Sequence, residues 1–266
     1  MNAASWIKSP KGYVILCLSL FLVIASVGAQ NIDGCINCMV AVLVSTATDM
    51  VCGIYSKRKR KLPDSAITTG LIIALVLSAT TSWYLVAATS IISILSKYVL
   101  AYKNKPIFNP AAFGLLMSIL LFGTGQSWWG AFGDLPDWTV AILLVGGYAV
   151  THRVNKFPQV FSFLGVYFVI LLIMGIFHVQ NVPDAFRPPF INATLFFALF
   201  MLTDPPTSPA KEKDQIKFGI LAAFIGAAIY GAFGGLTYLF VGLLSGNLYY
   251  FFKARFPVAS LLNLRL

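Results

Sequence analysis

The sequence predicts an all-α polytopic membrane protein with about ten transmembrane helices. Of its 266 residues, 58% are hydrophobic and only 11% are charged, whereas a soluble domain is about 45–50% apolar and about 25% charged. A spanning helix takes roughly 20 residues, so the chain has room for about ten crossings joined by short loops. The basic residues, which give a net charge of +10, fall between the apolar blocks. That is typical of membrane loops and differs from the basic stripe of a nucleic-acid-binding surface.

Ten apolar blocks follow one another along the chain. We interpret the first as a spanning helix and not as a cleaved signal peptide, because about 17 apolar residues exceed a signal h-region and a second apolar block follows. Two blocks, 138–150 and 190–203, are shorter than the hydrocarbon core requires. We count them as crossings because of the charges described next. The predicted spans are 13–29, 35–54, 66–82, 84–101, 107–123, 138–150, 158–177, 190–203, 216–233 and 236–252.

The loop charges indicate that both termini lie in the cytoplasm. With ten spans, the outer loops contain a single basic residue, Arg187, together with several aspartates. The inner segments contain the other 18 of the 19 Lys and Arg residues: Lys8, Lys11, Lys57, Arg58, Lys59, Arg60, Lys61, Lys97, Lys103, Lys105, Arg153, Lys156, Lys211, Lys213, Lys217, Lys253, Arg255 and Arg265. This distribution follows the positive-inside rule. Omitting one short span would place Lys211, Lys213 and Lys217 outside.

Ten spans divide into two groups of five. An odd number of crossings in each half forces the halves into opposite orientations, which is the arrangement of inverted-repeat membrane folds. We therefore expect a single membrane domain over 1–266, with a first five-helix repeat over 1–125 and a second over 126–266. The sequence similarity between the two halves is too weak for an alignment.

The first polar segment that interrupts the apolar pattern runs from Leu62 to Gly70, at the inner start of the third span. Asp64 or Ser65 is well placed to cap that helix, because either side chain accepts the free N–H groups of a first turn. A helix start rich in hydroxyls, which here include Thr68 and Thr69, also suits a phosphate or an electron-rich ring. A cap with no further role remains the alternative.

Two further polar segments stand at membrane boundaries. Asn109 followed by Pro110 at the start of the fifth span fits an N-cap with proline at the first helical position, and the small residues after it permit close helix packing. After the eighth span, the three prolines within 203–209 forbid regular helix. Backbone groups there must be satisfied by side chains or must line a cavity, unless the segment is simply a polar loop that leaves the bilayer.

These strings resemble the signature segments of a known membrane family. Phe-Asn-Pro-Ala-Ala at 108–112, Thr-Asp-Pro-Pro-Thr-Ser-Pro at 203–209 and Asp-Ser-Ala-Ile-Thr-Thr-Gly at 64–70 are similar to segments of the flavin-carrying membrane subunits of the sodium-translocating NADH:quinone reductase and the Rnf electron-transport complex. The resemblance covers about 9–252. It implies a ten-helix inverted repeat related in fold to urea and ammonium channels, which holds flavin and passes electrons in a bacterial cytoplasmic membrane together with partner redox subunits.

The resemblance also bears on how a cofactor would be held. The family usually carries flavin mononucleotide covalently on a Thr of a Ser-Gly-Ala-Thr motif after the fifth span, but here 123–129 reads Gly-Thr-Gly-Gln-Ser-Trp-Trp. A covalent flavin is therefore not expected, which leaves a non-covalent flavin (FMN or riboflavin), another redox carrier or a relative without electron transfer. No catalytic residue and no metal site are assigned. Inverted repeats place binding sites where interrupted helices meet, so we expect the polar segments around Asp64, Asn109 and Asp204 to converge near the interior of the bundle. The candidate cofactor-binding residues are Asp64, Ser65, Thr68, Thr69, Asn109, Thr203, Asp204, Thr207 and Ser208.

Three other residues could carry chemistry. Cys35 and Cys38 form a C-x-x-C at the outer start of the second span. Such a pair at a helix N-terminus could be a redox couple or half of a four-thiolate site shared with a partner, although inert cysteines are common in membrane helices. Asp49 is the acidic residue deepest in an apolar block, so it is a candidate functional carboxylate. Alternatively, it extends towards Lys57 and Arg58.

The leading functional hypothesis is an electron-transfer subunit that relays electrons through a non-covalent flavin. The sequence shows no nicotinamide-binding fingerprint, no complete iron–sulfur ligand set and no hydrolytic constellation, so the chain would be at most one subunit of an oxidoreductase complex. A channel or permease for a small solute, built on the same fold, is the main alternative. A structural subunit that only positions its partners is a third.

Overall fold

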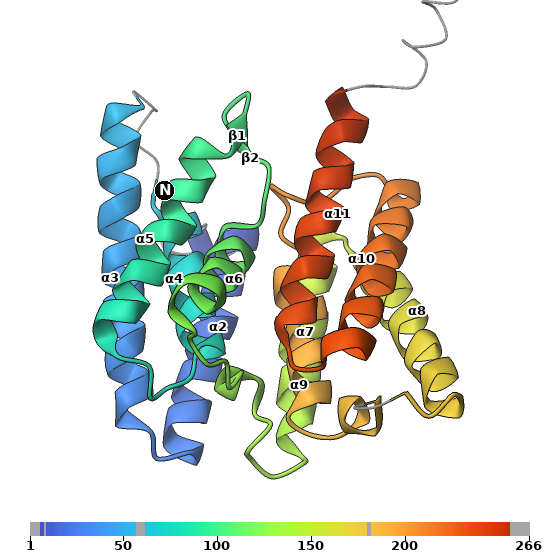
Figure 1. Ribbon diagram of the computed structural model, residues 1–266. Helices are drawn as coiled ribbons and strands as arrows, with labels where there is room; N and C mark the ends of the chain where they lie inside the picture. Colours follow the sequence, from blue (N-terminus) through green and yellow to red (C-terminus); the bar gives the residue numbers. More distant parts are fainter. Residues whose placement is uncertain (1–5, 8, 57–61, 180–181, 256–266) are drawn as a thin grey trace, which may run out of the picture.

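In the described part of the chain, ten apolar helices form from the ten apolar blocks, as the sequence predicts. The computed structural model describes residues 6–7, 9–56, 62–179 and 182–255, and within them the architecture is all-α apart from one short hairpin (Figure 1). The helices are α2 (Pro10–Gly28), α3 (Ile32–Tyr55), α4 (Asp64–Val76), α5 (Trp83–Val99), α6 (Pro110–Phe122), α7 (Thr139–Val154), α8 (Phe157–Ile176), α9 (Phe190–Phe196) with its π-helical continuation η3 (Phe197–Met201), α10 (Glu212–Phe233) and α11 (Thr237–Arg255). The hairpin pairs β1 (Ala101–Tyr102) with β2 (Lys105–Pro106), and the 3-10 helices are η1 (Trp129–Ala131) and η2 (Val182–Phe186).

The helices divide into long spanning helices and shorter ones. By length and composition, α2, α3, α8 and α10 are each able to cross a membrane. Their outer faces carry exposed apolar side chains, such as Leu43 on α3 and Ile176 on α8, as expected of surfaces that contact lipid. The chain is therefore an integral membrane protein, and its shorter apolar helices lie among the longer ones.

The helices α4 and α6 are too short to cross the bilayer alone. Each has 13 residues, or about 20 Å of helix against a hydrocarbon core of about 30 Å. The chain continues from both as extended segments that pair with each other: the Ser78 amide donates to the Gly125 carbonyl at 3.1 Å, and the Trp128 amide donates to the Val76 carbonyl at 3.1 Å. The prediction of a helix over 66–82 is thus wrong beyond Val76, because these backbone groups pair between segments.

Close packing brings the short helices into the centre of the bundle. Nine of the 13 residues of α4 are buried. Glycines permit this approach, since a Cβ at Gly70 would lie 2.8 Å from the Ala41 carbonyl oxygen and one at Gly114 would lie 1.7 Å from the Ser93 Oγ. The small residues at the start of α6 therefore do allow a close helix contact, as predicted.

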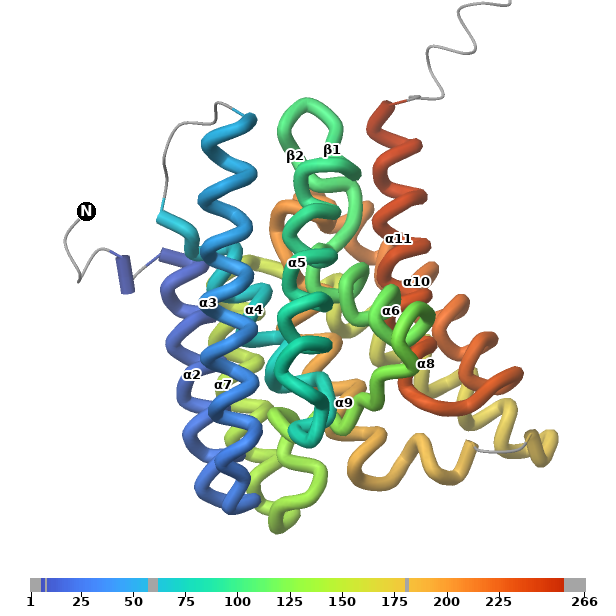
Figure 2. The backbone as a smooth tube through the Cα atoms, turned by 60° about the vertical axis from the view of Figure 1, so that its left-hand side comes forward, coloured from blue at the N-terminus to red at the C-terminus, as the bar shows by residue number. Residues whose placement is uncertain are grey.

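The segments predicted to lie on one side of the membrane share one end of the molecule. Figure 1 shows the β1–β2 hairpin and the C-terminal ends of α3 and α11 at its upper end, and the turn at 29–31 and the segment 123–138 at its lower end. The tube view in Figure 2 shows the same arrangement. Lys103 and Lys105 lie in the upper group, as do Lys253 and Arg255. The predicted inner residues that lie outside the described ranges are Lys8, Lys57, Arg58, Lys59, Arg60, Lys61 and Arg265.

Cysteine labelling tests the membrane orientation. Asp134 and Lys213 are both exposed, and the charge distribution predicts that they lie on opposite sides, with Asp134 outside. In a variant without native cysteines, we expect an impermeant thiol reagent added to intact cells to label Asp134→Cys and to spare Lys213→Cys until the membrane is opened. Labelling of Lys213→Cys in intact cells would contradict the predicted number of spans.

Candidate functional site

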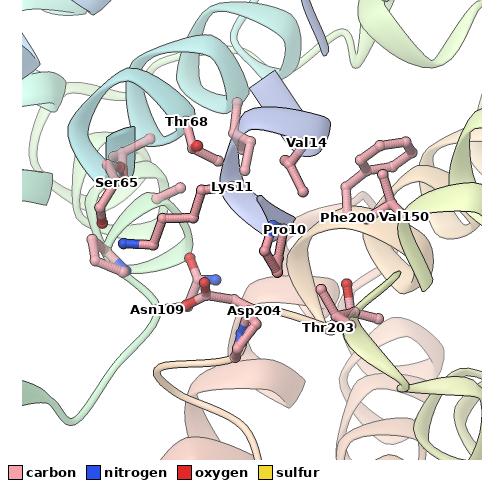
Figure 3. Close-up of a pocket in the computed structure, with 16 residues that line it drawn as sticks. Pro10, Lys11, Val14, Ser65, Thr68, Asn109, Val150, Phe200, Thr203 and Asp204 are labelled. Carbon is pink, nitrogen blue, oxygen red and sulfur yellow. Dashed lines mark hydrogen bonds between the residues drawn. The ribbon is translucent and has the colours of Figure 1, made fainter. Parts of the chain in front are cut away.

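The three polar segments of the sequence meet at the starts of α2, α4 and α6. They line a cavity of about 60 Å³, which has room for a few water molecules and is shown in Figure 3. Six of the nine candidate residues line this cavity: Ser65, Thr68, Thr69, Asn109, Thr203 and Asp204. The lining residues that the sequence analysis did not select are Pro10, Lys11, Val14, Ile72, Pro110, Ala111, Val150, Val154, Phe200 and Pro205. The convergence predicted from the sequence is confirmed for these segments.

Three helix N-termini border the cavity, and each carries the positive end of a helix dipole. The helix α2 begins behind Ser9, whose side chain caps the Gly12 amide at 3.1 Å, and α6 begins behind Asn109, whose Oδ1 accepts from the Ala112 amide at 3.1 Å. Asn109 is therefore the predicted N-cap. At α4, by contrast, Pro63 occupies the cap position and provides no side-chain hydrogen bond. The first N–H groups of α4 are thus left without a side-chain cap.

The prediction that Asp64 or Ser65 caps α4 is wrong. Asp64 is the first residue of the helix, and its Oδ1 accepts a 3.0 Å hydrogen bond from the Trp6 indole. Asp64 does not appear among the residues that line the cavity. The hydroxyls of Thr68 and Thr69 donate to backbone carbonyls one turn earlier, at 2.9 Å each, so their lone pairs remain to accept from a ligand.

The proline-rich segment 202–211 forms the wall opposite α4. It follows η3 as a non-helical break, and four of its backbone carbonyls, together with that of Met201 at the end of η3, accept from buried side chains of other elements. These hydrogen bonds run from the Asn109 Nδ2 to the Met201 carbonyl (3.2 Å), from the Gln159 Nε2 to Leu202 (2.7 Å), from the Asn247 Nδ2 to Thr207 (2.9 Å), from the Gln215 Nε2 to Ala210 (3.0 Å) and from the Lys156 Nζ to Pro209. The sequence-based expectation that side chains would satisfy this backbone is confirmed.

Asp204 is the acidic side chain of the cavity. Its Oδ2 accepts from the Thr207 hydroxyl at 2.9 Å, and its carbonyl accepts from the Ser208 hydroxyl at 2.7 Å. Thr207 and Ser208 therefore lie behind Asp204 and hold it, while neither is among the lining residues. Burial raises the pKa of Asp204, and the Thr207 hydrogen bond and the charges of Lys11 and Lys156 oppose that rise.

Lys11 supplies the positive side chain of the cavity. In Figure 3 its side chain extends into the space between Ser65 and Asn109, opposite Asp204. From the sequence, Lys11 is recognisable only as a loop charge that sets the membrane orientation. The cavity thus combines N–H groups of helix starts, hydroxyls and an ammonium group on one side with a carboxylate on the other.

A family model decides what kind of protein carries this cavity. The model described as the NQR2, RnfD, RnfE family matches residues 2–137 and 123–239. The chain belongs to this family. No individual curated protein matches the sequence significantly. The NQR2, RnfD, RnfE family is linked to membrane redox complexes, so membership indicates a subunit of a membrane complex and agrees with the resemblance read from the three motifs.

The remaining candidate residues of this family member lie apart from the cavity. Cys35 and Cys38, at the opposite end of the bundle from the α2 start, are free thiols. The Cys35 Sγ donates to the Ser26 Oγ at 3.0 Å, and Cys38 is buried. Neither thiol lines the cavity, so a redox role for the pair stays a prediction.

Asp49 is held by partners on the neighbouring helix. Its Oδ1 accepts from the Lys97 Nζ at 2.7 Å and from the Tyr98 hydroxyl at 2.9 Å, both on α5. Asp49 thus forms an ion pair with Lys97, in the last turn of α5. The alternative that it extends towards Lys57 and Arg58 involves residues outside the described ranges. A carboxylate paired in this way has its charge compensated.

The buried Lys156 predicts a pH dependence of stability. Burial lowers its pKa from the ordinary value of 10.5 to about 8, against the opposing effect of Asp204. Between these two values the folded protein binds fewer protons than the unfolded chain, so stability rises with pH there. We expect the thermal unfolding midpoint in detergent to rise by roughly 5 °C between pH 8 and pH 10, and Lys156→Met to remove most of that rise. The exposed Lys213→Met is the control, and an unchanged rise in Lys156→Met would refute the assignment.

Proposed function

We propose that the chain is a membrane electron-transfer subunit of the NQR and Rnf type, which binds a flavin (FMN or riboflavin) non-covalently at the cavity between α2, α4, α6 and the 202–211 break. It relays electrons to and from partner redox subunits in a bacterial cytoplasmic membrane, with both termini in the cytoplasm. The observation that carries the proposal is the convergence of three helix N-termini and the polar break on one cavity, in a chain of this family.

The chemistry of the cavity fits the polar edge of a flavin ring. A flavin supplies one- and two-electron transfer and accumulates negative charge when it is reduced. The helix starts and the Lys11 ammonium offer donors to the ring carbonyls and favour that negative charge. Asp204 offers an acceptor for a ring N–H, and Ile72 and Phe200 offer apolar walls. A volume of about 60 Å³ admits an edge of the ring and not a whole flavin, so these residues would hold that edge.

The hydrogen bonding of the break favours an electron-rich ligand over a bare cation. In transporters with broken helices, unwound backbone carbonyls coordinate the cation. Here the carbonyls of Met201, Leu202, Thr207, Pro209 and Ala210 already accept from side chains. The Lys11 ammonium and the start of α4, which has no side-chain cap, present positive charge to a ligand instead. This supports the binding of an electron-rich ligand such as flavin over a cation site within the alternative, a channel or permease for a small solute.

Two threonine hydroxyls in the connections that follow α4 and α6 are already engaged in hydrogen bonds. Thr124 is buried and its hydroxyl bonds that of Ser118 at 2.8 Å, while Thr80 bonds Ser78 at 2.9 Å. Neither stands in the Ser-Gly-Ala-Thr context that the family uses for phosphoester attachment. This supports a flavin held without a covalent bond.

The proposed inverted repeat, 1–125 and 126–266, is supported by the helix pairing. In the first five helices α3 packs on α5 and α5 on α6; in the second five α8 packs on α10 and α10 on α11. The third helix of each half, α4 and α9, is short or interrupted. Short segments at matching positions of two halves are typical of binding sites in inverted-repeat proteins. Both contribute to the cavity, α4 through Ser65 to Ile72 and the continuation of α9 through Phe200.

A denaturation experiment tests the mode of attachment. We expect protein purified in mild detergent to show flavin absorbance, and the flavin to leave with the supernatant after denaturation, because the acceptor motif is missing. A fluorescent protein band on a denaturing gel would show covalent attachment instead. A colourless preparation that passes solutes into liposomes would favour the channel alternative.

Two substitutions test the site. Asn109→Ala and Asp204→Ala each remove a polar group of the cavity, and we expect each to weaken flavin binding about tenfold, the effect of one lost hydrogen bond to a charged or buried partner. Asn192→Ala and Asp214→Ala are matched controls, because neither residue lines the cavity. Asn192 is a buried amide of α9, and Asp214, in the first turn of α10, pairs with Lys253 of α11. Flavin content is measured on protein that retains its wild-type elution profile and membrane yield. Unchanged affinity in both cavity variants would rule out this site.

A further inference from the structure

Asn247 connects two walls of the cavity although it does not line it. It lies in α11, is 1% exposed, and stands 138 residues from Asn109 in the sequence. Its Oδ1 accepts from the Asn109 backbone amide at 2.9 Å, and its Nδ2 donates to the Thr207 carbonyl at 2.9 Å. One side chain thus bonds both the start of α6 and the 202–211 break.

The two groups that Asn247 bonds belong to the two segments that carry Asn109 and Asp204 on the cavity wall. Asn109 lines it and caps α6. The Thr207 hydroxyl holds the Asp204 carboxylate that lines the opposite wall. Asn109 also donates from its Nδ2 to the Met201 carbonyl at 3.2 Å, so the hydrogen bonds form a closed ring that runs through Asn247, Asn109 and the break.

We propose that Asn247 is a positioning residue of the cavity, which fixes the separation between Asn109 and Asp204. A carboxamide is suited to this role because it places an acceptor and a donor at a fixed separation on one rigid group. The Asn109 amide requires the acceptor and the Thr207 carbonyl requires the donor, so both contacts set the orientation of the side chain. The effect on flavin rests on the proposed function, whereas the geometric role does not.

A second buried asparagine provides a matched control. Asn192 in α9 is also 1% exposed, and its Nδ2 donates to the Ala131 carbonyl at 3.0 Å. It joins α9 to η1, and neither Asn192 nor Ala131 lines the cavity. Replacing either asparagine by leucine removes a buried amide from the membrane interior, but only the change at Asn247 releases the cavity walls.

The first readout is the rate at which a thiol on the cavity wall is modified in the absence of any ligand, because this rate depends on the shape of the cavity. In a variant in which Cys17, Cys35, Cys38 and Cys52 are replaced by alanine, Ser65→Cys places a thiol on the cavity wall. We expect Asn247→Leu to change the rate at which a small methanethiosulfonate reagent modifies that thiol severalfold, and Asn192→Leu to leave the rate at its starting value. Equal rates in the starting protein and Asn247→Leu, or equal changes in both leucine variants, would overturn the proposal.

The second readout is flavin affinity, measured with riboflavin and FMN by fluorescence quenching. We expect Asn247→Leu to weaken binding about tenfold and Asn192→Leu to leave it unchanged. If the wild-type protein binds neither flavin, the proposed function fails while the labelling result still decides the role of Asn247. If Asn247→Leu does not reach the membrane, Asn247→Asp decides, because aspartate keeps the acceptor for Asn109 and loses the donor to Thr207. A wild-type labelling rate in Asn247→Asp would also overturn the proposal.

Discussion

The need to satisfy backbone polar groups at the edge of a bilayer controls this structure. An unpaired N–H or C=O in hydrocarbon costs several kcal/mol, and three prolines within 203–209 prevent a helix from doing the pairing. The chain instead supplies side-chain donors from α6, α8, α10, α11 and the α7–α8 connection to the carbonyls of 201–210. These donors fix the break in one conformation, and the break in turn fixes Thr203 and Asp204 on the cavity wall.

The same constraint explains why α4 and α6 can be half-length. Their extended continuations pair with each other, and Asn37 of α3 donates to the carbonyls of Ala79 and Thr81 at 3.0 and 2.8 Å. The Trp129 indole adds a 2.7 Å bond to the Ala74 carbonyl at the end of α4. With their C-terminal ends held in this way, both helices place their N-termini at the cavity. The site therefore depends on pairing at the far ends of the helices that form it.

Structural features that depend on neighbouring residues in the sequence could be predicted, whereas features that depend on contacts between distant residues could not. The ten helices follow from continuous apolar blocks, and the N-cap at Asn109 follows from the Asn-Pro pair. The end of α4 at Val76 could not be predicted, because the apolar pattern continues to 82 while the deciding partner is Gly125. The sequence marks Lys156 only as a loop charge, because its partner, Pro209, lies 53 residues away. Gln159 carried no signal at all, because its partner, Leu202, lies 43 residues away. A polar side chain within a membrane block, such as Asn247 in the tenth predicted span, was the available signal of such a contact.

The distribution of hydrogen bonds also gives the cavity its polarity. Four carbonyl oxygens of the 202–211 break accept hydrogen bonds from buried side chains. The first N–H groups of α4, by contrast, have no side-chain cap in the described structure. The start of α4 therefore presents its positive dipole end to the cavity without a capping side chain, and Lys11 adds a positive charge. A single carboxylate, Asp204, opposes them, and its burial favours the neutral form. Such a site stabilises a ligand that gains negative charge more than one that loses it. This asymmetry is what an acceptor of electrons requires of the protein around it, and it arises here from the way in which a proline-rich break is held at the membrane boundary.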